Sequence, residues 1–506
     1  MRFTSLIVEL VRAKPRWIFW SAVLALALVW LILPAALYLS PPGEVPTVLA
    51  FGREYQVGTT MGPPLSFWLA DVAFRAVGGY AFGVYLLAQI CFVVMMAAVF
   101  TLARALVGAQ QGVLAALLTL AIAAFSYPGL EFGPDTLARP LWALTLLHAW
   151  RVIGERQRGA WFALSIEIGL LFLTTVMAPV LLLLLLLFAL ATARGRVALR
   201  SVDPLFGLLV IAVIALPYMI WLARSGTALP HPAFTSIEAY AQQSGKLFGA
   251  LLLSALGVVA LIVANTRVFE PKAETWREDA PAIFRPPVDP LARPFVVFFG
   301  VVPPLLFALA SPAFGLDHVA GGEGVALLLI GLLAVIMGGD LIYLRRQQVL
   351  RTIWLVAMAV PVIVALATVL VPPWIDADEV QTSLPARAMG KFFADNYRLR
   401  TDRPLPVVAG DPQIASLIGL GAPSRPRVLF SDLHGKTPWI DADTVNTGGG
   451  LVVWRAHDTV GAPPEDIAKT FPGLVAEVPR TFDRLIEGQL EPLRIGWGVV
   501  RPRAGK

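Results

Sequence analysis

Two carboxylates flank apolar segments of this sequence, at positions where they could act on a substrate near an apolar surface. Glu44 lies five residues beyond the apolar run Trp17–Leu39, and Asp135 directly precedes another apolar run. A positioned carboxylate can accept the proton of an attacking hydroxyl group, so each residue is a candidate general base. Each also has an ordinary alternative. Glu44 is then a solvated loop residue, and Asp135 is an N-cap that accepts hydrogen bonds from the first helical N–H groups.

Basic and phenolic side chains accompany both carboxylates. The segment GREY places Arg53 and Tyr55 shortly after Glu44, and Arg139 follows Asp135 by four residues. A guanidinium offers several N–H donors to a phosphate, so Arg53 is suited to an anionic headgroup. Arg139 is alternatively the i,i+4 partner of Asp135 on one helix face.

The segment GPPLSFWLADVAFRAVGG predicts an amphipathic helix lying in a membrane interface. Asp71 and Arg75 are four residues apart and are expected to pair. The broad apolar face consists of Leu65, Phe67, Trp68, Val72, Phe74 and Val77.

Composition indicates a polytopic membrane protein. Of the 506 residues, 57% are hydrophobic and 15% are charged, whereas soluble domains are about half apolar and a quarter charged. The formal net charge of +6 arises from basic residues in short loops between apolar runs, a pattern of membrane orientation rather than of nucleic-acid binding. Trp17–Leu39 carries no charge over 23 positions, so we interpret it as a retained first helix rather than a cleaved signal.

We predict about eleven membrane crossings, with a break near Thr174–Pro179 because proline and two threonines interrupt a long apolar run. The predicted crossings are Trp17–Leu39, Ala81–Leu106, Gly112–Ser126, Thr136–Val152, Ala160–Thr174, Ala178–Thr192, Pro204–Leu222, Leu247–Ala264, Pro294–Ala310, Val325–Leu344 and Ile353–Val371.

Eleven crossings place all the basic loops on one side of the membrane, which the positive-inside rule makes the cytoplasm. We therefore expect a cytoplasmic N-terminus and place everything after Val371 on the opposite side. The basic loops are the N-terminus, Arg151–Arg158, Ala193–Arg200, Asn265–Asp279 and Leu344–Arg351.

The chain divides into two predicted domains, a transmembrane domain over residues 1–373 and a small α/β domain over residues 374–506. In the second, glycine, proline and charged residues return, and short buried strands alternate with turns or helices. The fragments AGD and NTGGG resemble parts of nucleotide loops, but neither a GxGxxG nor a Walker pattern is present.

Other polar residues give weaker indications. Glu167 falls inside a predicted crossing with no obvious partner, so it is either functional or neutral and hydrogen-bonded. His148 is expected to be structural. The single cysteine, Cys91, excludes an intrachain disulfide and fits a small buried residue. A divalent metal is compatible with this chemistry, but no histidine spacing indicates one, and no cofactor is assigned.

The order of these features resembles glycosyltransferase family 39 of the GT-C superfamily, over roughly residues 15–230. Members carry an acidic pair after the first helix and then HPPL; here Glu44 precedes Pro63 by nineteen residues, and GPPLSFWL occupies the HPPL position. The quoted segments GPDTLARPLWALTLLHAWRV, GLLFLTTVMAPVLLLLLLL and LPYMIWLARSG also resemble family motifs, and ARAMGKFFADNYRLRTDRPLPVVAGDP resembles the outer domain of bacterial members.

Three positions depart from the family pattern. Gly43 replaces the first acid of the pair, Gly62 replaces the histidine before the prolines, and Thr175 replaces a lysine near the helix break. We expect the fold to tolerate these changes, whereas an altered or lost activity is an alternative outcome.

The resemblance implies a membrane glycosyltransferase that moves a hexosyl or pentosyl group from a polyprenyl-phosphate donor, with inversion, to a lipopolysaccharide, lipid A, glycan or protein acceptor. It also implies the bacterial inner membrane, surrounding membrane lipids, a periplasmic C-terminal domain and no nucleic acid. Glu44 would be the base and Asp135 a second acid. The implied residues for donor phosphate or substrate are Arg53, Tyr55, Arg139, Arg224 and His231.

Two other functions remain open at this stage. A lipid or glycan transporter or flippase would carry charges and broken helices at the bilayer midplane, where Glu167 is the one candidate. A catalytically altered relative with an assembly role is favoured if the missing acid at Gly43 is decisive.

Overall fold

A computed structural model describes residues 3–59, 61–127, 130–225, 236–265, 282–344, 346–375, 379–430, 437 and 439–502. The candidate His231 and most of the predicted loop Asn265–Asp279 lie outside these ranges. By its internal contacts the chain forms two compact units. The first comprises Met1–Ile32 and Leu86–Ile363, and the second comprises Leu33–Tyr85 and Val364–Lys506.

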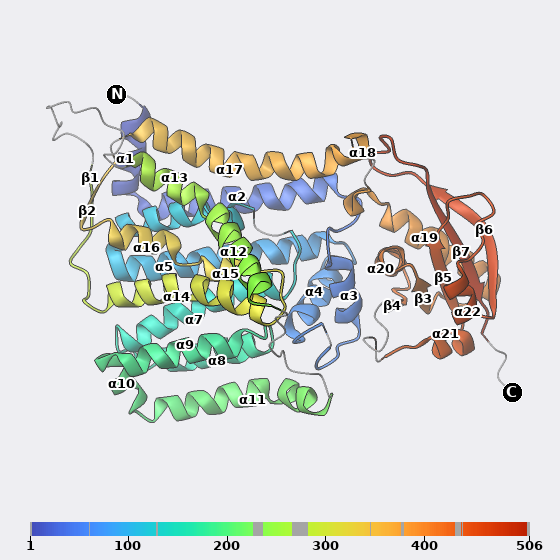
Figure 1. The fold of residues 1–506 in the computed structure, drawn as a ribbon, viewed down its shortest axis with the longest axis horizontal. Helices are drawn as coiled ribbons and strands as arrows, with labels where there is room; N and C mark the ends of the chain where they lie inside the picture. Colours follow the sequence, from blue (N-terminus) through green and yellow to red (C-terminus); the bar gives the residue numbers. More distant parts are fainter. Residues whose placement is uncertain are drawn as a thin grey trace. The chain divides into compact units, whose positions relative to one another are not determined.

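The first unit is built almost entirely from helices (Figure 1). The helices that lie wholly or mainly in it are α1 (Phe3–Ala13), α2 (Pro15–Leu37), α5 (Phe82–Leu120), α6 (Ala123–Ser126), α7 (Pro134–Ile153), α8 (Ala160–Phe172), α9 (Ala178–Ala191), α10 (Ala193–Leu199), α11 (Asp203–Arg224), α12 (Ile237–Ser254), α13 (Leu256–Asn265), α14 (Ala292–Ala313), α15 (Glu323–Ala326), α16 (Ile330–Met337) and α17 (Gln347–Leu370). Two short antiparallel strands, β1 (Ala282–Phe284) and β2 (Leu341–Tyr343), accompany them.

Each predicted crossing contains helix, but three of them are interrupted. Gly112–Ser126 runs from α5 into α6, Leu247–Ala264 runs from α12 into α13, and Val325–Leu344 comprises the end of α15, α16 and the strand β2. By length and composition, five described helices are long and apolar enough to cross a membrane, or up to seven if each of two bent helix pairs is one span. The chain is therefore a multi-pass membrane protein, and the number eleven stays a prediction. The predicted basic loop Ala193–Arg200 is itself helical: α10 leaves α9 at 112°.

Helix α5 covers nearly all of the predicted crossing Ala81–Leu106 and the first part of the predicted crossing Gly112–Ser126. Gly108 has φ 80° and ψ 170°, a conformation that costs glycine little because it has no Cβ. A Cβ on Gly112 would lie 3.1 Å from the backbone nitrogen of Arg104. In a straight helix those residues would be about 12 Å apart, so the chain reverses near Gly108.

The predicted break near Thr174–Pro179 is also present. Helix α8 ends at Phe172 and α9 begins at Ala178, with Pro179 in its first turn. Proline has no N–H to donate, and the first turn of a helix is the place where this is harmless. The Thr174 hydroxyl donates to the Leu170 carbonyl at 2.8 Å, which satisfies one carbonyl at the end of α8.

The second unit combines a segment from near the N-terminus with the C-terminal part of the chain. The helices α3 (Val45–Arg53) and α4 (Leu65–Ala76) pack on each other, and α3 also packs on α20 (Pro412–Gly421). The predicted domain boundary at residue 373 divides the chain at a single point, whereas the second unit also contains residues from near the N-terminus. The predicted boundary therefore remains a prediction.

The C-terminal part confirms the predicted α/β class. Its sheet has the order β4-β3-β5-β7-β6, in which β3 pairs in parallel with β4 and β5, and β7 pairs antiparallel with β5 and β6. The strands are β3 (Val407–Gly410), β4 (Arg427–Phe430), β5 (Gly450–Arg455), β6 (Leu474–Phe482) and β7 (Leu493–Val500), and the other helices are α18 (Pro372–Ile375), η2 (Gln381–Ser383), α19 (Ala386–Thr401), α21 (Ala442–Gly448) and α22 (Glu465–Thr470).

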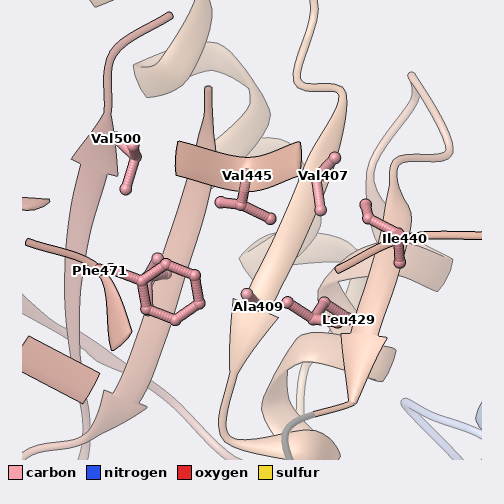
Figure 2. Packing of buried hydrophobic residues seen from close by; sticks show 8 residues of the cluster. Val407, Ala409, Leu429, Ile440, Val445, Phe471 and Val500 are labelled. Atoms are coloured by element: carbon pink, nitrogen blue, oxygen red, sulfur yellow. The ribbon is translucent and has the colours of Figure 1, made fainter. Parts of the chain in front are cut away.

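The strands β3 and β5 are apolar and buried because helices cover both faces of this part of the sheet. Figure 2 shows Val407 and Ala409 of β3 packed with Val445 of α21 and with Phe471, which follows α22. The opposite face of β3, β4 and β5 is covered by α20. All four residues of β3 are buried.

A partly buried ion-pair network ties the segment before η2 to the sheet. Glu379 Oε1 lies 2.6 Å from Nη2 of Arg455, and Glu379 Oε2 lies 2.6 Å from Nη2 of Arg484. Burial alone would raise the pKa of Glu379, but the hydrogen bonds from Arg455 and Arg484 outweigh burial, and the pKa lies below its ordinary value of 4.5.

This network predicts acid sensitivity. A carboxyl whose folded pKa is depressed contributes stability that is present above its unfolded pKa and is lost as the pH falls through the folded pKa. We expect the unfolding midpoint of the wild type to fall as the pH drops below about 4.5, and to fall less steeply in Glu379→Gln. Thermal unfolding between pH 7 and pH 3 measures this, and equal slopes in both proteins would contradict it.

Candidate active site

Glu44 lies at the N-terminus of α3, on the surface of the second unit. It occupies the N-cap position, but its side chain makes no capping hydrogen bond, and it is exposed. The preceding Gly43 has φ 51°, in the left-handed region that favours glycine. The departure from the family's acidic pair therefore falls at a turn where glycine is the least strained residue.

A segment more than 300 residues later holds this turn. The side-chain amide of Gln381 donates to the carbonyls of Pro41 and Gly43, at 2.8 and 2.9 Å. The Leu39 N–H donates to the Thr382 carbonyl at 2.9 Å. These bonds fix the backbone on the N-terminal side of Glu44, and nothing in the local sequence of Gln381 indicates this role.

Gln381 is in turn oriented by the sheet. Its side-chain oxygen accepts from Gln413 Nε2 at 3.2 Å, and Gln413 Oε1 accepts from Arg455 Nη2 at 2.7 Å. Arg455 is the same residue that pairs with Glu379. A continuous polar chain therefore joins the ion-pair network to the turn before Glu44.

We expect Gln381→Ala to lower kcat for any reaction that Glu44 carries out, by about tenfold or more, because small misplacements of a reacting group are costly. KM should change less, since Gln381 is a positioning residue. Gln489→Ala, the same change at an exposed position, is the matched control. Equal kcat values in the two variants would show that the turn does not need Gln381.

Arg53 and Tyr55 lie at the far end of α3 from Glu44. The helix contains nine residues, so the two ends are about 13 Å apart at 1.5 Å per residue. The structure therefore does not bring Glu44 together with Arg53 and Tyr55.

Arg53 and Tyr55 instead adjoin a fully buried carboxylate, Asp71 of α4. Asp71 pairs with Arg75 at 2.6 Å, as the sequence predicts. It also pairs with Arg425 at 2.7 Å, a contact that the sequence does not predict. The Tyr55 hydroxyl donates to Asp71 at 3.0 Å. Burial and then this hydrogen bond to Asp71 raise the pKa of Tyr55, so the phenol stays protonated at neutral pH.

The predicted helix with the Asp71–Arg75 pair is confirmed as α4. Phe67 and Phe74 of its apolar face are buried in the protein, whereas Val72 is 52% exposed. Its placement in a membrane interface stays a prediction.

Asp135 and Arg139 lie together in the first unit. Helix α7 has Gly133 at the N-cap and Pro134 as its first residue, so Asp135 stands inside the first turn and the N-cap alternative is wrong. Pro134 has no N–H to donate and is favoured as the first residue of a helix, so the N-cap falls on Gly133, two residues earlier than the sequence suggests. A carboxylate in the first turn still benefits from the positive end of the helix dipole.

A glycine-rich loop approaches these two side chains closely. A Cβ on Gly322 would lie 3.3 Å from Asp135 Oδ2, and one on Gly324 would lie 2.6 Å from Arg139 Nε. Burial disfavours the charge of the Arg139 guanidinium, and the nearby carboxylates of Asp135 and of Glu323, between the two glycines, offset part of this effect. Arg139 Nη1 donates to the Ala124 carbonyl at 3.3 Å, while its buried Nε has no hydrogen-bond partner among the described residues.

The remaining candidates lie elsewhere. Arg224 is exposed in the last turn of α11. The expectation that Glu167 has no partner is wrong: Glu167 Oε1 lies 2.7 Å from Nδ1 of His148, across the α7–α8 contact. This pairing favours the hydrogen-bonded interpretation of Glu167. Among the described residues, no group of three or more His, Cys, Asp or Glu side chains is placed to hold a metal ion.

The fold defines the class of the protein: a polytopic helical membrane protein with a small C-terminal α/β part. Residues 61–221 match the family model described as dolichyl-phosphate-mannose-protein mannosyltransferase. That match starts just before the GPPL segment and includes Asp135 and Arg139.

Two solved structures share the fold over nearly the whole chain. The crystal structure of ArnT from Cupriavidus metallidurans bound to undecaprenyl phosphate has a TM-score of 0.59 and 14% identity, covering 96% of this chain and 98% of that chain. The apo structure of the same protein has a TM-score of 0.57 and 12% identity with the same coverage. The search of curated proteins gives no match. Together with the family model, the fold confirms the resemblance to GT-C glycosyltransferases of family 39.

Proposed function

We propose that the protein is a membrane glycosyltransferase that takes a sugar from a polyprenyl-phosphate donor. The observation that carries this proposal is the fold match over 96% of the chain to an ArnT structure bound to undecaprenyl phosphate. The family-model match over residues 61–221, named for a transferase with a dolichyl-phosphate donor, supports the same donor chemistry.

In the proposed reaction an acceptor hydroxyl attacks the anomeric carbon of the donor sugar. The new C–O bond forms as the bond from the anomeric carbon to the phosphate oxygen breaks, and polyprenyl phosphate leaves with the bonding electrons. Glu44 accepts the hydroxyl proton. A single displacement of this kind inverts the anomeric centre, and charge develops on the sugar as in glycoside hydrolysis.

Asp135 and Arg139 serve as the second acid and as a phosphate or substrate contact. Arg139 has a buried Nε free to donate among the described residues, which suits the charge that develops on a leaving phosphate. The family resemblance adds Arg53, Tyr55, Arg224 and His231 as substrate-binding residues. The lipopolysaccharide, glycan or protein acceptor, the inner membrane and a periplasmic C-terminal part belong to the same proposal.

Gly43 favours the second candidate, a relative with an altered activity and an assembly role, because an acid is usual at this position. A lipid or glycan flippase is the third. The pairing of Glu167 with His148 removes the unpaired midplane charge that favoured transport.

The experiment that tests the proposal uses purified full-length protein in nanodiscs. Undecaprenyl-phosphate sugars are offered with lipopolysaccharide as acceptor, and fluorescent-lipid flipping is measured in parallel in liposomes. Glycosylated acceptor supports the proposal. Flipping without transfer from any donor would support a transporter, and neither activity would support the assembly role.

A further inference from the structure

A basic cavity of about 770 Å³ lies within the second unit, away from the Glu44 turn. Helix α4 and the glycines after it form one part of the wall. The last residue of α3, the beginning of α19, and the end of α20 with the loop after it form the rest. Its volume is in the range of small-molecule sites.

Five basic side chains line this cavity, and no acidic residue is among the described residues of its lining. They are Arg53, Arg75, Arg387, Lys391 and Arg425. Beneath them, Asp71 pairs with Arg75 and Arg425, and the nearby Glu54 pairs with Arg427 at 3.3 Å. Positive charge therefore remains in excess around the cavity.

Two of the guanidiniums hold unused donors. Nη1 of Arg53 and Nη1 of Arg425 are buried and have no hydrogen-bond partner among the described residues. Buried donors are normally satisfied, so such atoms need an explanation. Burial lowers the pKa of Arg425, and the positive charges of Arg53 and Arg75 lower it further, although the carboxylate of Asp71 acts in the opposite direction. A bound anion would offset the repulsion between these positive charges.

Aromatic contacts hold the basic side chains in place rather than leaving them extended in solvent. The Arg387 guanidinium carbon lies 3.6 Å from the centroid of the Tyr80 ring, and that of Arg425 lies 4.3 Å from the Phe74 ring. Such stacking pre-organises a guanidinium for a planar, multidentate contact. Arg425 also has φ 49°, and an outlier of this kind in a non-glycine residue is a recognised feature of ligand sites.

We propose that this cavity binds a ligand carrying two neighbouring phosphate groups or one phosphate dianion. Guanidinium and ammonium groups in this number suit oxyanions with several acceptor oxygens. The phosphate belongs either to a lipid headgroup or to a water-soluble compound. This site goes beyond the proposed transfer reaction, because four of its five basic residues have no role there and its binding can be measured without any transfer.

The test measures two probes against full-length protein in nanodiscs: inorganic pyrophosphate by calorimetry, and phosphatidylcholine vesicles with or without phosphatidic acid by co-sedimentation. The test variant is Arg387→Gln/Lys391→Gln. The control, Arg398→Gln/Lys469→Gln, removes the same charge from exposed positions of the same unit that do not line the cavity.

We expect at least one probe to bind about tenfold more weakly to the test variant than to the control. If the test variant binds pyrophosphate more weakly, a soluble phosphate compound is sufficient as the ligand. If it binds only the phosphatidic acid vesicles more weakly, the ligand is a lipid headgroup. Equal binding of both probes to the two variants, or no binding to the wild type, overturns the proposal. Protection of Lys391, but not Lys469, from amine acylation by pyrophosphate or by the vesicles gives a second readout in the wild type, independent of how the variants fold.

Discussion

Glu44→Gln is expected to lower the rate of sugar transfer about 10²–10⁴-fold, the range that a general base contributes. Glutamine keeps the size and the polarity of the side chain but cannot accept the proton of an acceptor hydroxyl. Because Glu44 is exposed and its side chain makes no capping hydrogen bond, the substitution should leave the unfolding midpoint unchanged. The measurement is the initial rate of acceptor glycosylation at saturating donor.

Glu465→Gln is the matched control for this prediction. Glu465 is exposed in α22 and pairs only at the surface, with Lys469 at 3.2 Å. The control should keep the wild-type rate. If Glu44→Gln also keeps that rate while transfer depends on Asp135, then Asp135 and not Glu44 is the base.

Asp71→Ala should produce the largest loss of stability, about 3–5 kcal/mol, because removing one partner of a buried ion pair leaves an uncompensated charge. Asp71 is 0% exposed and satisfies Arg75, Arg425 and Tyr55 together. Without it, the partly buried Arg425 retains a charge with no carboxylate bonded to it. Thermal unfolding of the purified full-length protein measures the effect.

Arg75→Ala is the control, since the Arg75 side chain is 58% exposed and an exposed partner typically contributes at most about 1 kcal/mol. If Asp71→Ala and Arg75→Ala lose similar stability, the contribution of Asp71 comes from its ion pair with Arg75 and not from its ion pair with the partly buried Arg425.

The sequence predicted those features that depend on local pattern. Apolar runs located the helices, the proline and threonines located the break between α8 and α9, and spacing located the Asp71–Arg75 pair. Short buried strands separated by turns also indicated the α/β part. These features are local because helix periodicity, turn chemistry and strand length are properties of neighbouring residues.

The parts that the sequence did not predict are contacts between distant segments. Gln381 bonds to Gly43, and Arg425 bonds to Asp71, across more than 300 residues. No periodicity connects such positions, so neither the support of the Glu44 turn nor the basic cavity could be read from the chain. The N-cap interpretation of Asp135 was wrong because the helix starts at Pro134, two residues earlier than predicted.

The most direct test of the proposed activity follows the donor itself. Purified wild-type protein is incubated with a panel of labelled undecaprenyl-phosphate sugars and lipopolysaccharide, and mass spectrometry quantifies undecaprenyl phosphate and glycosylated acceptor. We expect the two products to appear in equal amounts for at least one sugar, and Glu44→Gln to form neither at a comparable rate. Complete recovery of every intact donor, from protein that is folded and flips lipid, would contradict it.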